Sequence, residues 1–256
     1  MKKRWIYLLL SLFVLNTYAQ VKPDVNDFTV AALGMGAAVG LELFAKDHLM
    51  PSEPRFSVPN SFDQKMRTRA FWGQHSMHKA IDWSDRLLYG VSFTSIAWGP
   101  LLAESRESAF LINAEVFAAN AVATNLAKII VARERPYHFY ATSNSQGSDD
   151  YASFFSGHTS VAFSQAVTNA MILSESYAAV RPYIWASLLG TAGLTGYFRI
   201  AGDMHYATDV ITGAVVGSLI AWSITRYELD RFSKGSGTDP TVMLTMKIPL
   251  GRMISM

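Results

Sequence analysis

Apolar positions recur along this chain in segments whose length and spacing predict helices. The predicted helices are Phe28–Leu41, Leu87–Ala103, Ser108–Arg135, Thr159–Ser174, Pro182–Phe198 and His205–Arg226. Polar or irregular segments separate several of them, namely the proline-rich Pro51–Asn60, the charged Ser61–Asp85 and the loop Tyr140–Ser153. The pattern therefore predicts an all-α fold, a compact bundle of about six helices.

Three uncharged runs come close to the length of a membrane span: Leu87–Ala103 and Pro182–Phe198, with 17 residues each, and Val210–Thr225, with 16. A span usually needs about 20 residues, so buried helices of a compact domain would have the same pattern. The predicted helix Ser108–Arg135 also carries Glu115, Asn120, Asn125 and Lys128, which suit a protein interior or a water-filled site better than lipid. The sequence leaves a membrane-embedded bundle and a compact soluble one open, and slightly favours membrane association.

The first residues have the three parts of a secretory signal peptide. Lys2–Arg4 is basic, Trp5–Leu15 is apolar, and Thr17–Ala19 supplies small residues before Gln20. We therefore expect cleavage after Ala19 and an exported protein of the cell envelope, facing the periplasm, either soluble or associated with the inner membrane. An uncleaved N-terminal anchor is the alternative.

After residues 1–19, residues 20–256 are predicted to form a single helical domain with its motifs between residues 128 and 209. A polar link at Ser233–Asp239 and a strand-like segment at Thr241–Leu250 form an irregular tail over residues 233–256. The oligomeric state is not indicated by the sequence.

Composition excludes several classes of function. The formal net charge is only +2, which gives no reason to expect a nucleic-acid partner. Cysteine is absent, so disulfides, thiolate metal sites and cysteine nucleophiles are excluded. The spacing of His75, His78, Asp82 and Asp85 resembles that of metal ligands, but solvated helix residues explain it better. No metal site and no cofactor are therefore predicted.

The stretch Arg199–Asp209 places an arginine, a histidine and an aspartate in an otherwise apolar quarter of the sequence. If the segment after Gly202 is helical, His205 and Asp209 lie on one face, one turn apart. The aspartate can then accept a proton from one ring nitrogen, which leaves the lone pair of the other free to react. Arg199 approaches from a different element, because Gly202 interrupts the helix. A His–Asp pair that only stabilises a helix is the alternative.

A second candidate lies in Lys128–Pro136. Lys128 and Arg135 are seven residues apart, so on a continuous helix both project from the same face. Pro136 then ends the helix or redirects the chain. The arginine offers a planar fork and the lysine a point charge, which together suit a phosphate group. A solvated basic face is the alternative, and we assign Arg133 and Glu134 to such a face.

A third candidate is Ser156-Gly157-His158, which follows a polar loop and precedes an apolar helix. The start of a helix offers backbone N–H groups, a hydroxyl and the positive end of the helix dipole to an anion. His158 could deliver a proton to a leaving oxygen from this position. A helix cap formed by Ser156 or Thr159 is the alternative.

Taken in order, these motifs resemble the signature of the type 2 phosphatidic acid phosphatase / vanadium-dependent haloperoxidase superfamily. The resemblance rests on Lys-x6-Arg-Pro, Ser-Gly-His and Arg-x5-His-x3-Asp, and it covers Lys128–Asp209. Phe155 stands where the family usually has proline, and Phe198 where it usually has serine. Neither position carries a chemical role in the family's mechanism, so the departure affects at most how one phosphate-binding group is oriented.

The resemblance implies specific roles for these residues. His205 would be the nucleophile that forms a phosphohistidine, Asp209 would hold its ring, and His158 would protonate the leaving alkoxide and later activate water. The phosphoryl oxygens would be held by Lys128, Arg135, Ser156, Gly157 and Arg199. Three cations and N–H donors suffice for phosphoryl transfer without a metal. The site would lie at the ends of the central helices.

The implied activity is a metal-independent phosphatase, a phosphoric monoester hydrolase acting on a lipid or prenyl (di)phosphate. An exported acid phosphatase of broad specificity, acting on phosphorylated small molecules, is the first alternative. Further alternatives are a vanadate-dependent haloperoxidase and a non-catalytic membrane protein that binds phosphate. The intact His158, His205 and Asp209 argue against the last of these.

Overall fold

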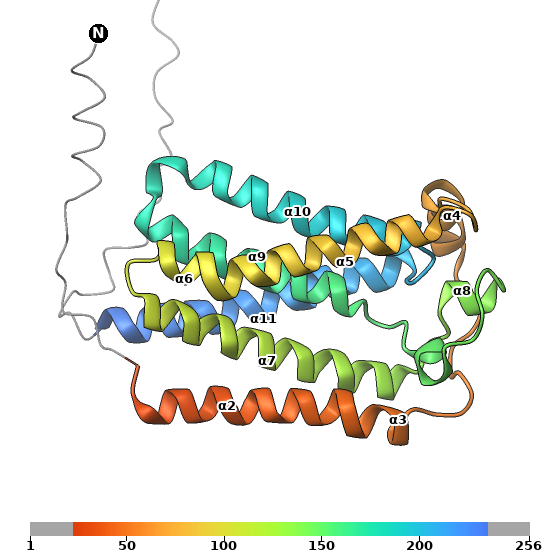
Figure 1. The fold of residues 1–256 in the computed structure, drawn as a ribbon, viewed down its shortest axis with the longest axis horizontal. Helices are drawn as coiled ribbons and strands as arrows, with labels where there is room; N and C mark the ends of the chain where they lie inside the picture. The colour runs from red at the N-terminus through yellow and green to blue at the C-terminus, as the bar shows by residue number, and fades with distance from the viewer. Residues whose placement is uncertain (1–22, 235–256) are drawn as a thin grey trace, which may run out of the picture. The chain divides into compact units, whose positions relative to one another are not determined.

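Six long helices dominate the computed structural model, which describes residues 23–234. They are α2 (Val25–Gly40), α5 (Met77–Phe93), α7 (Arg106–Val131), α9 (Gly157–Ser176), α10 (Arg181–Ala201) and α11 (Ala207–Lys234) (Figure 1). Shorter helices are α3 (Lys46–Leu49), α4 (Ser61–Ala70), α6 (Gly99–Leu102) and α8 (Pro136–Phe139), with π-helical turns at Leu41–Ala45 and Thr94–Trp98 and 3-10 turns at Gly147–Tyr151 and Ala178–Val180. The predicted all-α fold is confirmed.

The predicted signal peptide and the predicted strand-like segment lie outside the described residues. Residues 23–228 make up one compact unit, and the following paragraphs concern that unit.

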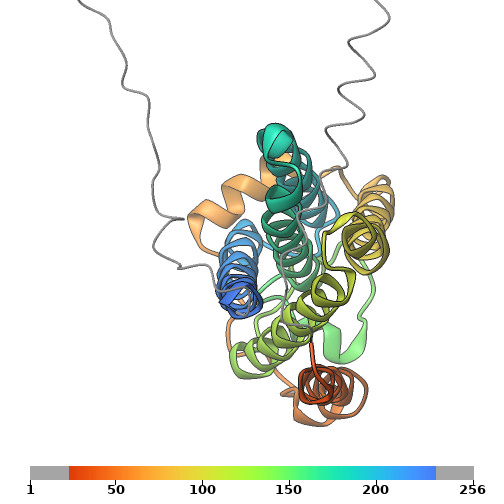
Figure 2. The same ribbon diagram turned by 90° about the vertical axis from the view of Figure 1, so that its left-hand side faces the viewer.

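Helix α9 is the central helix of this unit, packed against α5, α7 and α10 (Figure 2). Thirteen of its twenty residues are buried, as expected for a helix enclosed on most sides. Many of these are polar, and they pair across helix interfaces. Ser160 donates to Asn120 of α7, and Asn169 donates to Asn113 of α7 at 3.0 Å. Such pairing offsets the cost of burying polar side chains.

Two glycines of α11 set how closely that helix approaches α9. A Cβ atom added at Gly217 would lie 2.3 Å from the carbonyl oxygen of Ser160, and one at Gly213 would lie 2.7 Å from that of Ser156. Both distances are far below van der Waals contact, so only glycine fits. Because Ser156 precedes the first residue of α9, this contact places the start of α9 against α11 near the predicted site.

Several predicted boundaries were wrong. The charged segment Ser61–Asp85 and the apolar run Leu87–Ala103 were treated as separate, yet α5 continues through the junction as Met77–Phe93. The predicted helix Ser108–Arg135 ends at Val131, where Ala132 adopts a left-handed conformation with φ of 44°. In α5, the composition changes from charged to apolar within a single helix. In α7, the left-handed backbone of Ala132 ends the helix.

Among residues 23–234, three helical segments are long and apolar enough to cross a membrane: Val25–Phe44, Arg106–Val131 and Ala207–Phe232. The last of these contains the predicted run Val210–Thr225, whereas the other two predicted runs do not meet this criterion. In α7, Asn120 and Asn125 are buried, while Leu126 and Ile130 are 44% and 63% exposed. The polar side chains thus face the bundle and an apolar face remains outside, as in a helix that borders lipid. These features support membrane association.

The contact between α9 and α11 predicts that Gly217→Ala destabilises the protein. Alanine normally favours a helix over glycine, but here its methyl group would overlap the α9 backbone. Overpacking of this kind typically costs about 1–3 kcal/mol, so the thermal unfolding midpoint of the purified protein should fall by several degrees.

The matched control is Gly190→Ala in α10, an exposed position with no atom within 4 Å of the added Cβ. It should leave the midpoint unchanged or raise it slightly. A Gly217→Ala protein as stable as the control would show that the helices do not approach as closely as described.

Candidate active site

The predicted site residues gather at the end of the bundle where α7 and α10 finish and where α9 and α11 begin (Figure 1). Direct bonds join the three motifs. The backbone N–H of Ser156 donates to the carbonyl of Asp209 at 3.1 Å, and Arg133 binds the Asp209 carboxylate. A Cβ added at Gly157 would lie 3.6 Å from the amine of Lys128, so the end of α7 adjoins the start of α9. All eight predicted residues lie in this region, and their proposed roles remain to be tested.

Lys128 and Arg135 approach this region for a different reason from the one predicted. They do not share a helical face, because α7 ends at Val131 and Arg135 lies beyond the turn, just before α8. The backbone N–H of Arg135 donates to the carbonyl of Asp150 at 2.7 Å, which fixes the chain there. The two cations therefore reach the site from two separate elements.

His205 is buried, with 2% of its surface exposed. Its Nδ1 lies 2.8 Å from the carbonyl oxygen of Ser153. Since a carbonyl only accepts hydrogen bonds, Nδ1 carries the proton and the lone pair of Nε2 remains available. Burial, followed by the positive charges of Arg135, Arg199 and Lys128, holds the pKa of His205 well below its usual range. A neutral imidazole among cations is the state that a nitrogen nucleophile requires.

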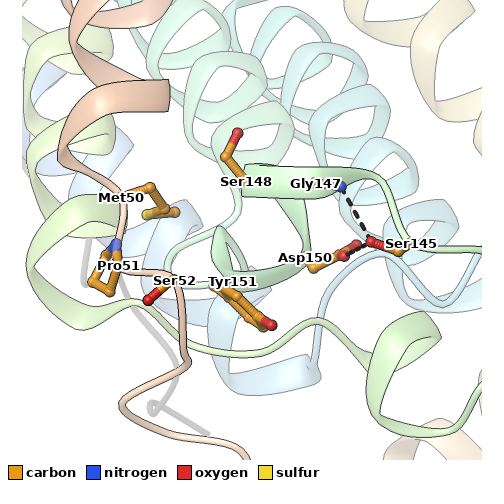
Figure 3. Close-up of a pocket in the computed structure, with 8 residues that line it drawn as sticks. All are labelled: Met50, Pro51, Ser52, Ser145, Gly147, Ser148, Asp150 and Tyr151. Atoms are coloured by element: carbon orange, nitrogen blue, oxygen red, sulfur yellow. Dashed lines mark hydrogen bonds between the residues drawn. The ribbon is translucent and has the colours of Figure 1, made fainter.

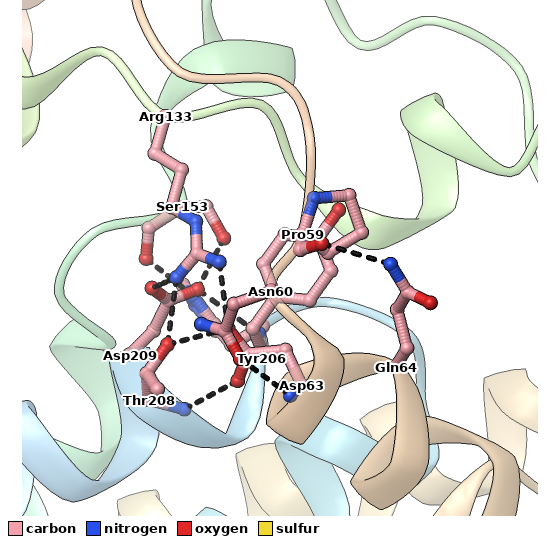
Figure 4. A network of polar contacts seen from close by, with 10 residues as sticks. Pro59, Asn60, Asp63, Gln64, Arg133, Ser153, Tyr206, Thr208 and Asp209 are labelled. Atoms are coloured by element: carbon pink, nitrogen blue, oxygen red, sulfur yellow. Dashed lines mark hydrogen bonds and ion pairs between the residues drawn. The ribbon is translucent and has the colours of Figure 1, made fainter.

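Asp209 does not contact the His205 ring, contrary to the prediction. Helix α11 begins at Ala207, so His205 precedes the helix and the two side chains are not on one helical face. Instead, the Asp209 carboxylate accepts hydrogen bonds from the Ser153 hydroxyl at 2.6 Å and from the Tyr206 backbone N–H at 2.9 Å (Figure 4). Ser153 thus links the two residues, because its hydroxyl donates to Asp209 and its carbonyl accepts from the His205 ring.

Arg133 is part of this network and not of a solvated face, so that prediction was wrong. Its guanidinium binds Asp209 at 2.5 Å and Asp63 at 2.8 Å, and its side chain is only 12% exposed (Figure 4). It also lies 4.2 Å above the centre of the Tyr206 ring. Nothing in the sequence pairs Arg133 with Asp63, because 70 residues separate them.

His158 has a carboxylate partner that the sequence did not reveal. Its Nε2 lies 2.9 Å from Oδ1 of Asp85 in α5, and the same oxygen lies 3.3 Å from Nη1 of Arg199. The neighbouring Ser84 hydroxyl accepts a hydrogen bond from Arg199 at 3.1 Å. The assignment of Asp85 to a solvated helix face was therefore wrong. Only the packing of α5 against α9 and α10 brings this carboxylate to the site.

Two arginines of the site have buried donors without an acceptor among the described residues. These are Nε and Nη1 of Arg135 and Nε of Arg199. Arg135 also pairs with Asp149 at 3.6 Å. Buried donors that lack an acceptor carry a free-energy cost. A doubly charged oxyanion held between the arginines would supply acceptors and offset the positive charge.

A groove of about 390 Å³ lies between Met50–Ser52 and the turn Gly147–Tyr151, lined in part by Asp150 (Figure 3). Burial acts to raise the pKa of Asp150, but hydrogen bonds from Ser145, Gln146 and Tyr137 lower it overall. None of the eight predicted site residues lines this groove. Its connection to the site is the bond between Asp150 and the backbone of Arg135.

The unsatisfied arginine donors predict oxyanion binding. Inorganic phosphate or orthovanadate should raise the thermal unfolding midpoint of the purified protein. At a ligand concentration one hundred times Kd, the free energy of unfolding should rise by about 2.7 kcal/mol. Arg135→Gln should remove most of this gain, because it deletes two of the buried donors. The exposed Arg69→Gln in α4 serves as control and should keep the full gain. Equal gains in the two variants would contradict the assignment.

Comparison with known proteins agrees with this geometry. Residues 109–233 match the family model of the PAP2 superfamily. The chain is 26% identical over 242 residues to lipid A 1-phosphatase of Porphyromonas gingivalis, covering 86% of this chain and 49% of that protein. It thus spans about half the length of this curated relative.

Among solved structures, the fold is similar to that of a transmembrane PAP2-type phosphatidylglycerolphosphate phosphatase from Bacillus subtilis, with a TM-score of 0.52 at 16% sequence identity. The similarity covers 80% of this chain and 96% of that chain. The matched region contains each of the three motifs and all eight predicted site residues. The family-model match and the similarity to lipid A 1-phosphatase support assignment of residues 109–233 to the PAP2 superfamily.

Proposed function

We propose that this protein is a metal-independent phosphatase that hydrolyses a lipid phosphate ester through a phosphohistidine on His205. The observation that carries the proposal is the environment of His205. Its Nδ1 proton is held by a backbone carbonyl, and positive charges from Arg135, Arg199 and Lys128 surround the ring. The nucleophilic nitrogen and the groups that attract a phosphoryl dianion thus occupy the same place.

The first half of the reaction transfers the phosphoryl group to the protein. Nε2 of His205 forms a bond to phosphorus as the bond to the leaving oxygen breaks, and His158 gives that oxygen a proton. Lys128, Arg135 and Arg199 neutralise the charge on the remaining oxygens, since phosphoryl transfer depends mainly on positioning and electrostatics. In the second half, His158 accepts a proton from water, which attacks phosphorus and releases phosphate from His205.

The start of α9 contributes further donors. Ser156 caps this helix, and Gly157 is its first residue, so the Gly157 N–H has no partner within the helix. The side chain at position 157 is limited by space, because an added Cβ would lie 3.2 Å from Thr124 and 3.6 Å from the Lys128 amine. Glycine therefore lets the phosphate approach both the backbone and the lysine.

A lipid is the substrate class that the remaining observations favour. The two similar proteins are described as acting on lipid A and on phosphatidylglycerolphosphate. In the part of the chain that the structure describes, three helical segments are long and apolar enough to cross a membrane. We further propose that the protein is exported, with its mature chain starting at Gln20 and the site facing the periplasm, on the basis of the tripartite N-terminus.

Location and substrate class are tested by fractionation. The mature protein should remain in the membrane pellet after alkaline wash, and N-terminal sequencing should begin at Gln20. Recovery in the wash would favour the soluble, broad-specificity acid phosphatase instead. Sequencing that begins at Met1, from protein located in the cytoplasm, would refute export.

Substrates whose leaving groups differ in acidity distinguish the roles of His205 and His158. His205→Ala should abolish turnover and the covalent phosphoenzyme on every substrate. General acid assistance is worth about 10²–10⁴-fold, so His158→Ala should be severely impaired on an alkyl phosphate and much less on an aryl phosphate with an acidic phenol. Asp85→Asn should show the same selectivity in milder form, because Asp85 contacts His158.

Asp82→Asn is the matched control, an exposed carboxylate on the same helix. It should keep full activity on both substrates. The roles would be exchanged if a good leaving group rescued His205→Ala but not His158→Ala. If neither histidine substitution changed turnover, the proposed phosphatase function of this site would be refuted.

A further inference from the structure

The segment that contains His205 is short, and side chains of another helix bind it on both sides of the histidine. We define the nucleophile loop as residues 202–208, which run from the end of α10 through the first two residues of α11. Helix α4, which lies outside the part of the chain matched by the family model, contacts this loop at two points. One contact lies two residues before His205, at Asp203, and the other three residues after it, at Thr208.

The first contact is a bidentate ion pair. Nε of Arg67 lies 2.6 Å from Oδ1 of Asp203, and Nη2 of Arg67 lies 2.7 Å from Oδ2. Asp203 is fully buried and has a left-handed backbone with φ of 60°, which is uncommon for a residue other than glycine. Thr142 donates to the same carboxylate at 2.7 Å. The pair therefore holds a tight, unusual turn in place.

The second contact fixes the other side of the loop. Oδ1 of Asp63 accepts the backbone N–H of Thr208 at 2.9 Å, and Oδ2 accepts the Thr208 hydroxyl at 2.7 Å. Asp63 is fully buried, and Arg133 neutralises its charge at 2.8 Å (Figure 4). Asp63 thus caps α11 from another helix, since Thr208 lies in the first turn of α11.

Both contacts come from one face of α4. Asp63 and Arg67 are four residues apart in a helix that Asn60 caps, so they lie one turn apart on the same side. Ala70, one further turn along, is buried against Ile200, which precedes the nucleophile loop, and against Ala207, which lies within it. One short helix therefore fixes the distance between the two sides of the loop.

We propose that α4 is a clamp that positions His205, with Arg67 and Asp63 as positioning residues that never touch substrate. This proposal rests on the proposed role of His205 as nucleophile. A nucleophile in phosphoryl transfer must lie in line with the leaving oxygen, and a displacement of about 1 Å can cost about 10²-fold in rate. Loss of the clamp should therefore slow the chemical step and leave substrate binding, which depends on the cations, nearly unchanged.

The test compares Arg67→Met with Arg69→Met, the same substitution at an exposed position of the same helix. In single-turnover experiments, Arg67→Met should form the phosphoenzyme about 10- to 100-fold more slowly per folded molecule, with KM little changed. Arg67→Lys keeps the charge but loses the bidentate geometry and should be intermediate. Arg69→Met should match the wild type.

Hydrogen exchange gives a readout that does not depend on activity. Amides of residues 203–208 should exchange faster in Arg67→Met than in Arg69→Met. If Arg67→Met does not fold, Asp63→Asn and Thr142→Val, which weaken single contacts of the clamp, decide the question through the same two measurements. Folded clamp variants with wild-type phosphoenzyme formation, or with unchanged exchange in the loop, would overturn the proposal.

Failure of the proposed function is distinguishable from failure of the clamp. A wild-type enzyme that forms no phosphoenzyme on His205 refutes the mechanism, whatever the clamp variants do. Faster exchange confined to residues 203–208 would in that case still show that α4 holds the loop.

Discussion

The constraint on which this site depends is the concentration of positive charge around a buried imidazole. Arg135, Arg199 and Lys128 all lower the pKa of His205, and they can only be kept together by elements that the rest of the fold holds rigid. Asp85 and Asp149 offset part of that charge through ion pairs with Arg199 and Arg135. The remaining excess of positive charge, together with the buried guanidinium donors, would favour a phosphoryl dianion at this site.

The carboxylates around the site form two separate networks with different partners. Asp85 contacts Arg199 and His158, the residue that we propose as proton donor to the leaving group. Asp209 is linked to His205 through Ser153 and through the backbone N–H of Tyr206, and it forms an ion pair with Arg133. Separation lets each histidine be oriented without disturbing the other. It also explains why the helices that supply these groups, α5 and α11, must both be packed accurately against α9.

The helices combine a polar interior with apolar outer faces. In α7, buried Asn113 and Asn120 bind side chains of α9, whereas Ile130 is exposed. A lipid environment would cover such a face, and interhelical polar contacts would then hold the bundle together where burial of apolar groups against lipid gives little driving force. The site at the helix ends would lie where a lipid head group meets water.

The sequence by itself determined the all-α fold, most of the long helices and the eight candidate site residues, because apolar periodicity and motif spacing are local properties. It did not determine the geometry that relates them. Lys128 and Arg135 approach the site from separate elements because Ala132 turns the chain, and Asp209 is linked to His205 through Ser153 because α11 starts after His205. Asp85, Arg133 and α4 join the site through contacts across about 70 residues or more. Such contacts leave no periodic signal along the chain, since they depend on how helices pack, and only the tertiary structure decided them.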